Sequence, residues 1–268
     1  MTRLALVTGA STGIGRACAE RLAERGYHVL AGVRREGDAP PGTEPLRLDV
    51  TDDADVAGAA RRAGGALHVL VNNAGIAVNG PVETVPVDEW RRQLEVNVIG
   101  QVAVTRALLP ALLAARGRVV NMSSISGRVA LPLLGPYAAS KFALEAVTDV
   151  LRREVGPLGV RVVAIEPGGI ATPVWDKSLS AADDLLAEMP EDARRRYDRT
   201  IRLVWRFAEA MREDGLPPSA VADAVERAVT ARRPRTRYVV GRDARIQGVL
   251  ARVLPDRGFD ALLRYFIR

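Results

Sequence analysis

Short apolar runs rich in β-branched residues alternate along most of the chain with longer stretches whose apolar residues recur every three or four positions. The short runs predict buried strands and the longer stretches predict amphipathic helices. Strands are predicted at 3–9, 27–33, 45–49, 67–72, 117–122, 160–166 and 237–240. Helices are predicted near 14–25, 52–63, 88–115, 137–155 and 219–232.

This alternation indicates βαβ units, and right-handed crossovers assemble such units into a doubly wound sheet. The predicted fold class is therefore α/β, a Rossmann-type doubly wound parallel sheet of about seven strands with helices on both faces. We expect residues 1–268 to form a single domain, because the turn-rich loop at 38–44 is too short to be a domain linker.

Residues 173–217 interrupt the alternation, and residues 243–268 are predicted to form a helical tail. The interruption has no strand pattern, but apolar residues recur at helical spacing from Tyr197 to Met211. Either this stripe only packs on the end of the sheet, or the segment is a substrate-binding insertion, since ligands bind beyond the carboxyl ends of the strands. The candidate substrate-pocket residues are Leu131, Leu133, Leu134, Val174, Trp175 and Trp205.

Composition narrows the function classes. The net charge of +6 comes from 38 basic and 32 acidic residues that are mixed along the chain, which argues against a nucleic-acid partner. Cys18 is the single cysteine and cannot form an intrachain disulfide, so a reducing, cytoplasmic location is expected. No membrane span or signal peptide is recognised. The two histidines and the cysteine have no metal-site spacing, so no metal is predicted.

The first predicted strand runs into Thr8-Gly-Ala-Ser-Thr-Gly-Ile-Gly15 and then into a helix. Glycines at 9, 13 and 15 permit a tight turn and a close approach of ligand to backbone, and the helix N-terminus directs free N–H groups at the same place. This combination favours a pyrophosphate site over a purely structural turn.

Three further strand ends bear on the cofactor. Arg34 and Arg35 follow the second strand where an NAD site has an acid, which favours NADP(H). The alternatives are that these arginines are solvated surface or that Glu36 turns to the ribose. Asp49 ends the third strand and could accept from an adenine amino group or cap the helix near 52. Asn72-Asn-Ala-Gly75 ends the fourth, either as a strand-end turn or as small residues close to a flat ligand.

Tyr137 and Lys141 lie four residues apart on one face of a predicted helix. Lys141 and Lys177 are the only lysines in a chain with 36 arginines, so a lysine at this position is unlike incidental surface charge. An ammonium beside a phenol favours the phenolate and predicts a general acid/base. Ser124 lies 13 residues earlier and could donate to a substrate oxygen, with Ser123 and Ser126 as rivals.

Asn97, an amide among apolar residues of a predicted helix, needs a buried partner. Together with Pro167-Gly168 and Thr172, these motifs resemble the short-chain dehydrogenase/reductase family over roughly 3–172. The resemblance implies that Tyr137 exchanges the proton, Ser124 polarises the substrate oxygen, Lys141 assists Tyr137 and holds the ribose, and Asn97 positions a water. It implies cofactor contacts at Gly9, Ser11, Thr12, Gly13, Ile14, Gly15, Arg34, Asp49, Val50, Asn73, Ala74, Gly75, Tyr137, Lys141, Pro167, Gly168, Ile170 and Thr172.

The tail from Pro234 to Ala244 resembles that of members acting on lipophilic alcohols such as steroids and retinoids. The family resemblance also implies a homodimer or homotetramer that pairs through helices 88–115 and 137–155. The predicted function is an NADP(H)-preferring oxidoreductase that transfers a hydride between nicotinamide and a carbonyl or alcohol, without a nucleic-acid or membrane partner. The alternative is a non-catalytic NADP(H)-binding sensor, which need not retain Ser124, Tyr137 and Lys141.

Overall fold

A seven-stranded parallel sheet forms the centre of the computed structural model, which describes residues 2–172 and 182–267. Its strand order is β3-β2-β1-β4-β5-β6-β7, so the direction of winding reverses between β1 and β4. This arrangement confirms the predicted fold class and places a crevice for ligands at the switch point. The strands are β1 (Leu4–Thr8), β2 (His28–Val33), β3 (Glu44–Arg47), β4 (Val69–Asn72), β5 (Arg118–Met122), β6 (Arg161–Pro167) and β7 (Arg237–Val240).

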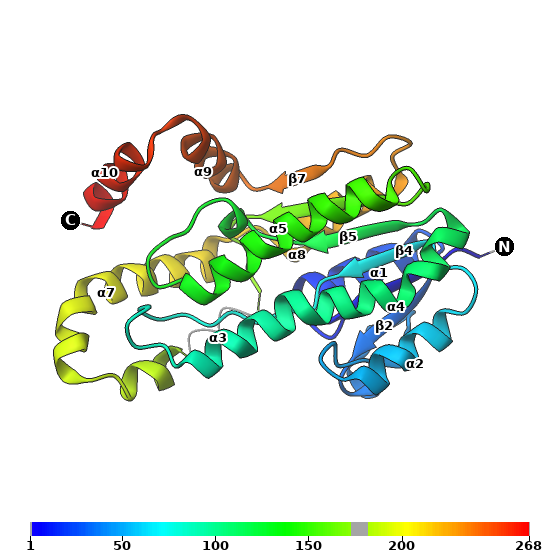
Figure 1. Ribbon diagram of the computed structural model, residues 1–268, viewed down its shortest axis with the longest axis horizontal. Helices are drawn as coiled ribbons and strands as arrows, with labels where there is room; N and C mark the ends of the chain where they lie inside the picture. Colours follow the sequence, from blue (N-terminus) through cyan, green and yellow to red (C-terminus); the bar gives the residue numbers. More distant parts are fainter. Residues whose placement is uncertain (1, 173–181, 268) are drawn as a thin grey trace.

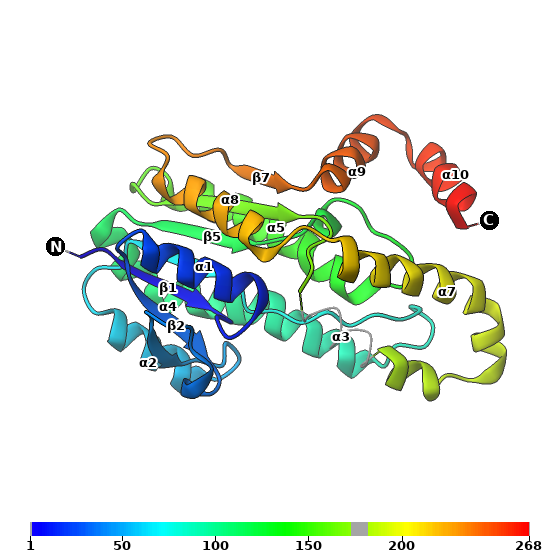
Figure 2. The ribbon, with the colours of Figure 1, turned by 180° about the vertical axis from the view of Figure 1, so that it is seen from behind.

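Helices cover both faces of the sheet. Figures 1 and 2, which view the molecule from opposite sides, show α1 (Gly13–Glu24) and α8 (Pro218–Thr230) on one face. The other face carries α2 (Asp53–Ala63), α4 (Gly100–Ala115) and α5 (Gly135–Val155). The parallel strands are therefore buried on both sides, as their continuous apolar runs require.

Alternate residues of each strand enter two separate cores. In β1, Val7 packs with Cys18 and Leu22 of α1 and with residues of α8, whereas Leu6 packs with residues of α2 and α4. The period of two in side-chain direction explains this division. Leu6 and Val7 are both fully buried, so the central strand is fixed from both sides.

The predicted helix at 88–115 is three consecutive pieces. They are α3 (Val87–Leu94), a π-helical turn η2 (Glu95–Ile99) and α4. The whole stretch Val87–Ala115 is apolar and long enough to cross a membrane by length and composition alone. In the structure its C-terminal half packs on the sheet, with Val104, Leu108 and Leu112 fully buried in the second core.

The insertion and the tail lie beyond the carboxyl ends of the strands, at the left of Figure 1. The predicted apolar stripe belongs to α7 (Glu191–Asp214), where Tyr197, Ile201 and Trp205 pack on a small apolar cluster of Leu186, Met189 and Ala193. The tail forms α9 (Arg242–Val253) and α10 (Asp256–Ile267). Two short 3₁₀ turns, η1 (Glu36–Asp38) and η3 (Ile125–Gly127), follow β2 and β5.

Candidate active site

A cavity of about 570 Å³ opens at the carboxyl ends of the strands. Every residue expected to contact the cofactor lines it, and so does Ser124. Ten further residues line it, of which the sequence suggests only Ser123, as a rival of Ser124: Gly32, Val33, Leu48, Thr51, Ile76, Arg92, Glu95, Val96, Met122 and Ser123. Several of these directly neighbour predicted residues, so strand-end position could have found them, whereas Arg92 and Glu95 come from α3 and η2 and carried no sequence signal.

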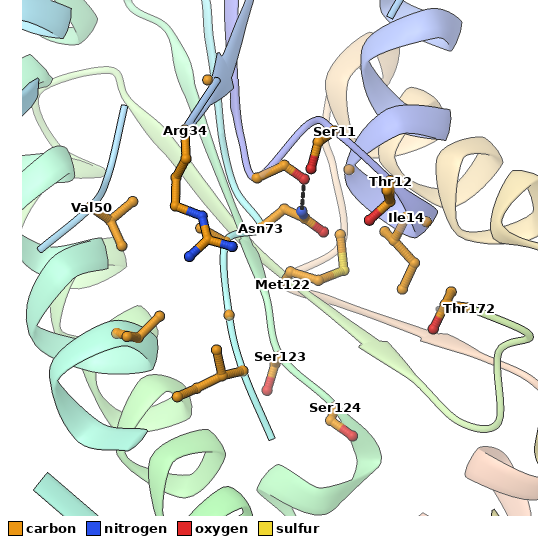
Figure 3. Close-up of a pocket in the computed structure, with 18 of the residues that line it drawn as sticks. Ser11, Thr12, Ile14, Arg34, Val50, Asn73, Met122, Ser123, Ser124 and Thr172 are labelled. Atoms are coloured by element: carbon orange, nitrogen blue, oxygen red, sulfur yellow. Dashed lines mark hydrogen bonds between the residues drawn. The ribbon is translucent and has the colours of Figure 1, made fainter. Parts of the chain in front are cut away.

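The glycine loop between β1 and α1 forms one wall of this cavity. Gly9 and Gly13 have φ angles of 64° and 57°, which favour glycine. A Cβ at Gly15 would collide with the carbonyl oxygen of Gly9, so α1 starts against the loop itself. Thr12 caps α1 without a side-chain hydrogen bond, which leaves first-turn N–H groups for an anion. Asn73 braces the loop by donating to the Gly9 carbonyl at 3.1 Å (Figure 3).

The two arginines that follow β2 have different surroundings. The Arg34 side chain points into the cavity, as Figure 3 shows. Arg35 instead pairs with Asp38 at 3.2 Å, and its side chain is 85% exposed. Neither Arg35 nor Glu36 lines the cavity. Of the three interpretations of this strand end, an arginine that reaches the ligand space is the one that the geometry supports for Arg34, whereas Arg35 is solvated surface.

The structure also separates the two interpretations of Asp49. The cap of α2 is Asp52, whose carboxylate accepts from the N–H groups of Ala54 and Asp55 at 2.8 and 2.9 Å. Asp49 lines the cavity and accepts from the Thr51 N–H at 3.0 Å and the Thr51 hydroxyl at 2.7 Å. These bonds, with help from nearby Arg34, hold the pKa of Asp49 below its ordinary value. Asp49 is thus a carboxylate facing the ligand space.

Ser124, Tyr137 and Lys141 meet at the opposite end of the cavity. Tyr137 and Lys141 lie one turn apart near the start of α5, and Ser124 caps η3 after β5. The Ser124 hydroxyl accepts from the Ser126 N–H at 3.1 Å and donates to the Pro167 carbonyl at 3.5 Å. Of the rival serines, Ser126 uses its N–H to orient Ser124.

Lys141 is buried, donates from Nζ to the Met122 carbonyl at 2.8 Å, and lies 5.6 Å from the centre of the Tyr137 ring. Burial lowers the pKa of Lys141 to about 8. Burial raises the pKa of Tyr137 above its ordinary value, and a hydrogen bond from Ser124 opposes that rise. The sequence predicts that the lysine favours the phenolate. In the structure Lys141 lies beside the Tyr137 ring and bonds to the backbone, and the hydrogen bond from Ser124 is what opposes the rise in the pKa of Tyr137, so the role of the lysine stays a prediction.

Asn97 does not line the cavity. It lies in the π-helical turn, where its amide donates to the Ile76 carbonyl at 3.0 Å and accepts from the Ile76 N–H at 2.9 Å. It also donates to the Ser140 hydroxyl at 3.1 Å, which in turn donates to the Tyr137 carbonyl at 2.7 Å. Asn97 thus fixes the backbone after β4 and links it to the turn of α5 that carries Tyr137.

The loop after β6 is held by the C-terminal third of the chain. Gly168 donates to the Val240 carbonyl at 2.9 Å, and Gly169 donates to the Asp243 carboxylate at 2.8 Å. A Cβ at Gly168 would collide with that carboxylate, so α9 lies directly on the loop. Leu216, just before α8, accepts from Ala171 at 2.9 Å and donates to Gly169 at 3.0 Å.

The candidate substrate-pocket residues lie elsewhere. Leu131 packs against the apolar cluster of Ile125, Val129 and Ala244, which joins η3 to α9. Leu133 is buried, and its carbonyl accepts from Gly80 at 2.7 Å. Trp205 donates to Asp183 at 3.1 Å. These three and Leu134 do not line the described cavity, and Val174 and Trp175 lie outside the described residues. Hydrophobicity alone could not distinguish packing positions from pocket positions.

No group of three or more histidine, cysteine, aspartate or glutamate side chains within 2–172 and 182–267 is arranged to hold a metal ion.

A family model described as short chain dehydrogenase matches residues 3–183. Among solved structures, a short chain dehydrogenase from Burkholderia cenocepacia in complex with NADP has a TM-score of 0.77 and 29% identity, covering 100% of this chain and 98% of that one. A similar structure from Burkholderia phymatum, in complex with NAD, has a TM-score of 0.77 and 26% identity, covering 98% and 95%.

Two curated relatives are similar along nearly the whole chain. The NADPH-dependent 3-dehydrocapnine reductase of Ornithobacterium rhinotracheale is 37% identical over 277 residues, covering 97% of this chain and 95% of that protein. Retinol dehydrogenase 5 of Mus musculus is 39% identical over 285 residues, covering 97% and 87%. The likeness thus extends through the insertion and the tail, beyond the part that the family model matches.

Proposed function

Because this chain belongs to the short-chain dehydrogenase family and is an NAD(P)-dependent oxidoreductase of alcohols and carbonyl compounds, we propose that it prefers NADP(H) and reduces a lipophilic carbonyl substrate. The observation that carries the proposal is the cavity itself. It brings an uncapped helix N-terminus and Arg34 together at one end and Ser124, Tyr137 and Lys141 at the other. An elongated cofactor with phosphate groups toward one end and a reactive ring at its far end matches this distribution of groups.

The residues present fit a dinucleotide. The first turn of α1 would take the pyrophosphate, and Asp49 with Val50 would contact the adenine. Lys141 would bind the ribose next to the nicotinamide, and Pro167, Gly168, Ile170 and Thr172 would hold the nicotinamide ring. When bound, the nicotinamide supplies or accepts the hydride.

The remaining chemistry falls to this chain's own side chains. Tyr137 donates the proton to the substrate oxygen during reduction and removes it during oxidation. Its pKa, raised by burial, keeps the phenol protonated and ready to donate at neutral pH. The Ser124 hydroxyl donates its proton to the substrate oxygen and so orients that oxygen for Tyr137. The buried Lys141 ammonium stabilises that charge across the short distance between the two side chains.

The preference for NADP(H) is supported by Arg34. A guanidinium binds a 2′-phosphate with two parallel hydrogen bonds, and Glu36, the acid that follows β2, does not line the cavity. The relative from Ornithobacterium is named as NADPH-dependent, in agreement with this assignment. An NADP(H) preference in turn favours reduction as the direction in the cell.

A lipophilic substrate is supported by what lies beyond the strand ends. The helical insertion brings an apolar cluster of Leu186, Met189 and Ala193, covered by Tyr197, Ile201 and Trp205, to the side of the molecule where the strands end. One relative is a retinol dehydrogenase, and retinol is a lipophilic alcohol. The intact set of Ser124, Tyr137 and Lys141 argues against the alternative of a non-catalytic sensor.

We further propose a cytoplasmic homodimer or homotetramer. The buried free thiol of Cys18 agrees with a reducing compartment. Ile99, Val102, Phe142 and Val150 are exposed apolar residues on the helices η2, α4 and α5, which supports pairing of subunits through this face.

The experiment that tests the cofactor assignment is a titration of NADPH and NADH by fluorescence in wild type, Arg34→Ala and Arg35→Ala. Arg35→Ala is a matched control, because Arg35 pairs with Asp38 and does not line the cavity. We expect NADPH to bind wild type more tightly, and Arg34→Ala alone to lose about 10–100-fold in NADPH affinity, as one charged hydrogen-bonded pair is worth about 1.5–3 kcal/mol. Equal affinities for both cofactors in wild type would refute the preference.

A further inference from the structure

A buried ion network lies one turn beyond the lysine of the candidate active site. Arg237 of β7 donates to Glu145 of α5 at 2.9 Å and also pairs with Asp149 at 3.0 Å and Glu166 at 3.2 Å. Arg128 donates to Glu166 at 2.7 Å. Glu166 is fully buried and Glu145 is 8% exposed. Burying carboxylates is costly even when they are paired, so the network suggests a function beyond stability.

Three members of the network adjoin parts of the site. Glu145 follows Lys141 by four residues on α5, and Glu166 directly precedes Pro167, the last residue of β6. Arg128 directly follows η3, the turn that Ser124 caps. The ions therefore join the three elements that place the reacting groups.

Glu145 is the member that acts on Lys141. Its Oε2 atom is engaged by Arg237, while its Oε1 atom is buried and has no hydrogen-bond partner among the described residues. Its Cγ atom would lie 3.0 Å from a Cβ at Gly127, so the side chain is packed against the turn of Ser124. Burial lowers the pKa of Lys141 to about 8, and the Glu145 carboxylate opposes that fall.

The other charges around this part of α5 are balanced or lie at the cavity wall. Arg128 and Arg237 are opposed by Glu166 and Asp149. The titratable and charged groups on α5 and on the elements packed against it here are Tyr137, Glu145 and Asp149 from α5, Arg128 after η3, Glu166 from β6, Arg237 from β7, Arg92 from α3 and Glu95 from η2.

We propose that Glu145 is a positioning residue for the reaction: its buried carboxylate, fixed by Arg237, keeps the Lys141 side chain a cation while Tyr137 exchanges its proton. Lys141 is buried, and Arg237 holds the Glu145 carboxylate in a fixed position one helical turn away from it. The inference rests on the role proposed for Lys141, but the charge on that lysine can be measured without any turnover.

The chain allows that measurement because it has two lysines, Lys141 and Lys177. Protein labelled with ¹³C-lysine gives two side-chain signals by NMR, and Lys177→Arg identifies the one from Lys141. We expect a titration midpoint near 8 in wild type. In Glu145→Gln we expect it to fall by on the order of one pH unit, the effect of losing one nearby opposite charge.

Asp149→Asn is the matched control, because Asp149 also pairs with Arg237 but lies two turns from Lys141. Its midpoint should equal that of wild type. A Glu145→Gln midpoint equal to that of wild type overturns the proposal. If Glu145→Gln does not fold, Arg237→Gln is measured instead. The Glu145 carboxylate then loses the guanidinium that competes with Lys141 for it, so the Lys141 midpoint should rise. An unchanged midpoint overturns the proposal.

Kinetics separate this inference from the proposed function. In an active enzyme, the alkaline limb of the kcat/KM profile should move to lower pH in Glu145→Gln, because Lys141 then loses its proton earlier, and should stay in place in Asp149→Asn. If the Lys141 midpoint does not fall in Glu145→Gln, the inference is wrong while the proposed function is unaffected. A protein that reduces no carbonyl compound with NADPH, yet shows the shift, defeats the proposed function and leaves the charge relation intact.

Discussion

Burial acts in opposite directions on the two neighbouring side chains of α5. It favours the neutral form of each, so it raises the pKa of Tyr137 and lowers the pKa of Lys141 to about 8. A protonated phenol is the form that reduction consumes, and a charged lysine is the form that stabilises the phenolate left behind. With the roles proposed for these two side chains, we expect the pair to be set for reduction at a pH below about 8.

Tyr137→Phe tests this residue directly, because it removes the titrating hydroxyl and almost no volume. We expect kcat to fall about 10²–10⁴-fold, the usual contribution of a general acid, with NADPH affinity preserved. Stopped-flow or steady-state assays with a carbonyl substrate measure the loss. Tyr238→Phe is the control, since the Tyr238 hydroxyl binds the backbone of Arg235 and does not line the cavity. A Tyr137→Phe enzyme with near-normal turnover would exclude the assigned role.

Single residues differ in how far the sequence can predict them. The tight turn at Gly9 and Gly13 was predictable, because few residues other than glycine adopt a positive φ without strain. The choice between a ligand-facing and a helix-capping role for Asp49 was not, because only the backbone path decides that Asp52 caps the helix instead. Glu145 gave no signal, since a helical acid near arginines looks like ordinary surface until β7 is known to bring Arg237 beside it.

At the scale of elements, α9 bridges two loops of the site. Asp243 in its first turn holds the loop after β6 through Gly169, and Ala244 packs with Ile125 and Val129 of the segment after β5. The tail therefore contributes to the position of both the serine and the nicotinamide-binding loop. Its helical character was predictable, but these contacts were not, because they join residues about 75 to 120 positions apart in sequence.

Asp243→Ala should loosen the loop after β6. We expect the KM for NADPH to rise about 5–100-fold, because a partly buried N–H loses its acceptor at a cost of about 1–3 kcal/mol. Asp243→Asn keeps an acceptor oxygen and should recover most of the loss. Asp256→Ala, in the exposed first turn of α10, is the control. If Asp243→Ala binds NADPH as wild type does, the contact has no part in cofactor binding.

At the scale of the whole molecule, the doubly wound parallel sheet with helices on both faces followed from the alternation of patterns, because a parallel sheet buried on both faces leaves few arrangements. The division of helix 88–115 by a π-helical turn did not follow, since its apolar spacing continues through the turn. The same global packing encloses the single thiol. Cys18 is fully buried under α8, and burial raises its pKa to about 12.

Cys18 should therefore report the opening of the fold. Iodoacetamide should label the native protein only through unfolded or opened molecules, because the thiolate is absent and inaccessible in the closed fold. NADPH at about 100 times its Kd should slow labelling about 100-fold, by stabilising the closed form by roughly 2.7 kcal/mol. Mass spectrometry of the single cysteine gives the rate. A rate of Cys18 labelling that does not change with NADPH would contradict the expectation that the cofactor stabilises the closed form.

The strand order has a consequence for the growing chain on the ribosome. β4 is placed beside β1, and from β5 onward each strand is placed beside the one synthesised before it, so every new strand finds an edge already formed. The glycine loop, Arg34 and Asp49, which we propose hold the adenosine half of the cofactor, have all been synthesised by the time β4 and its loop have emerged. The opposite half waits for Asp243, which lies 25 residues from the end of the 268-residue chain. A nascent chain should thus acquire its grip on the adenosine long before it can hold the nicotinamide.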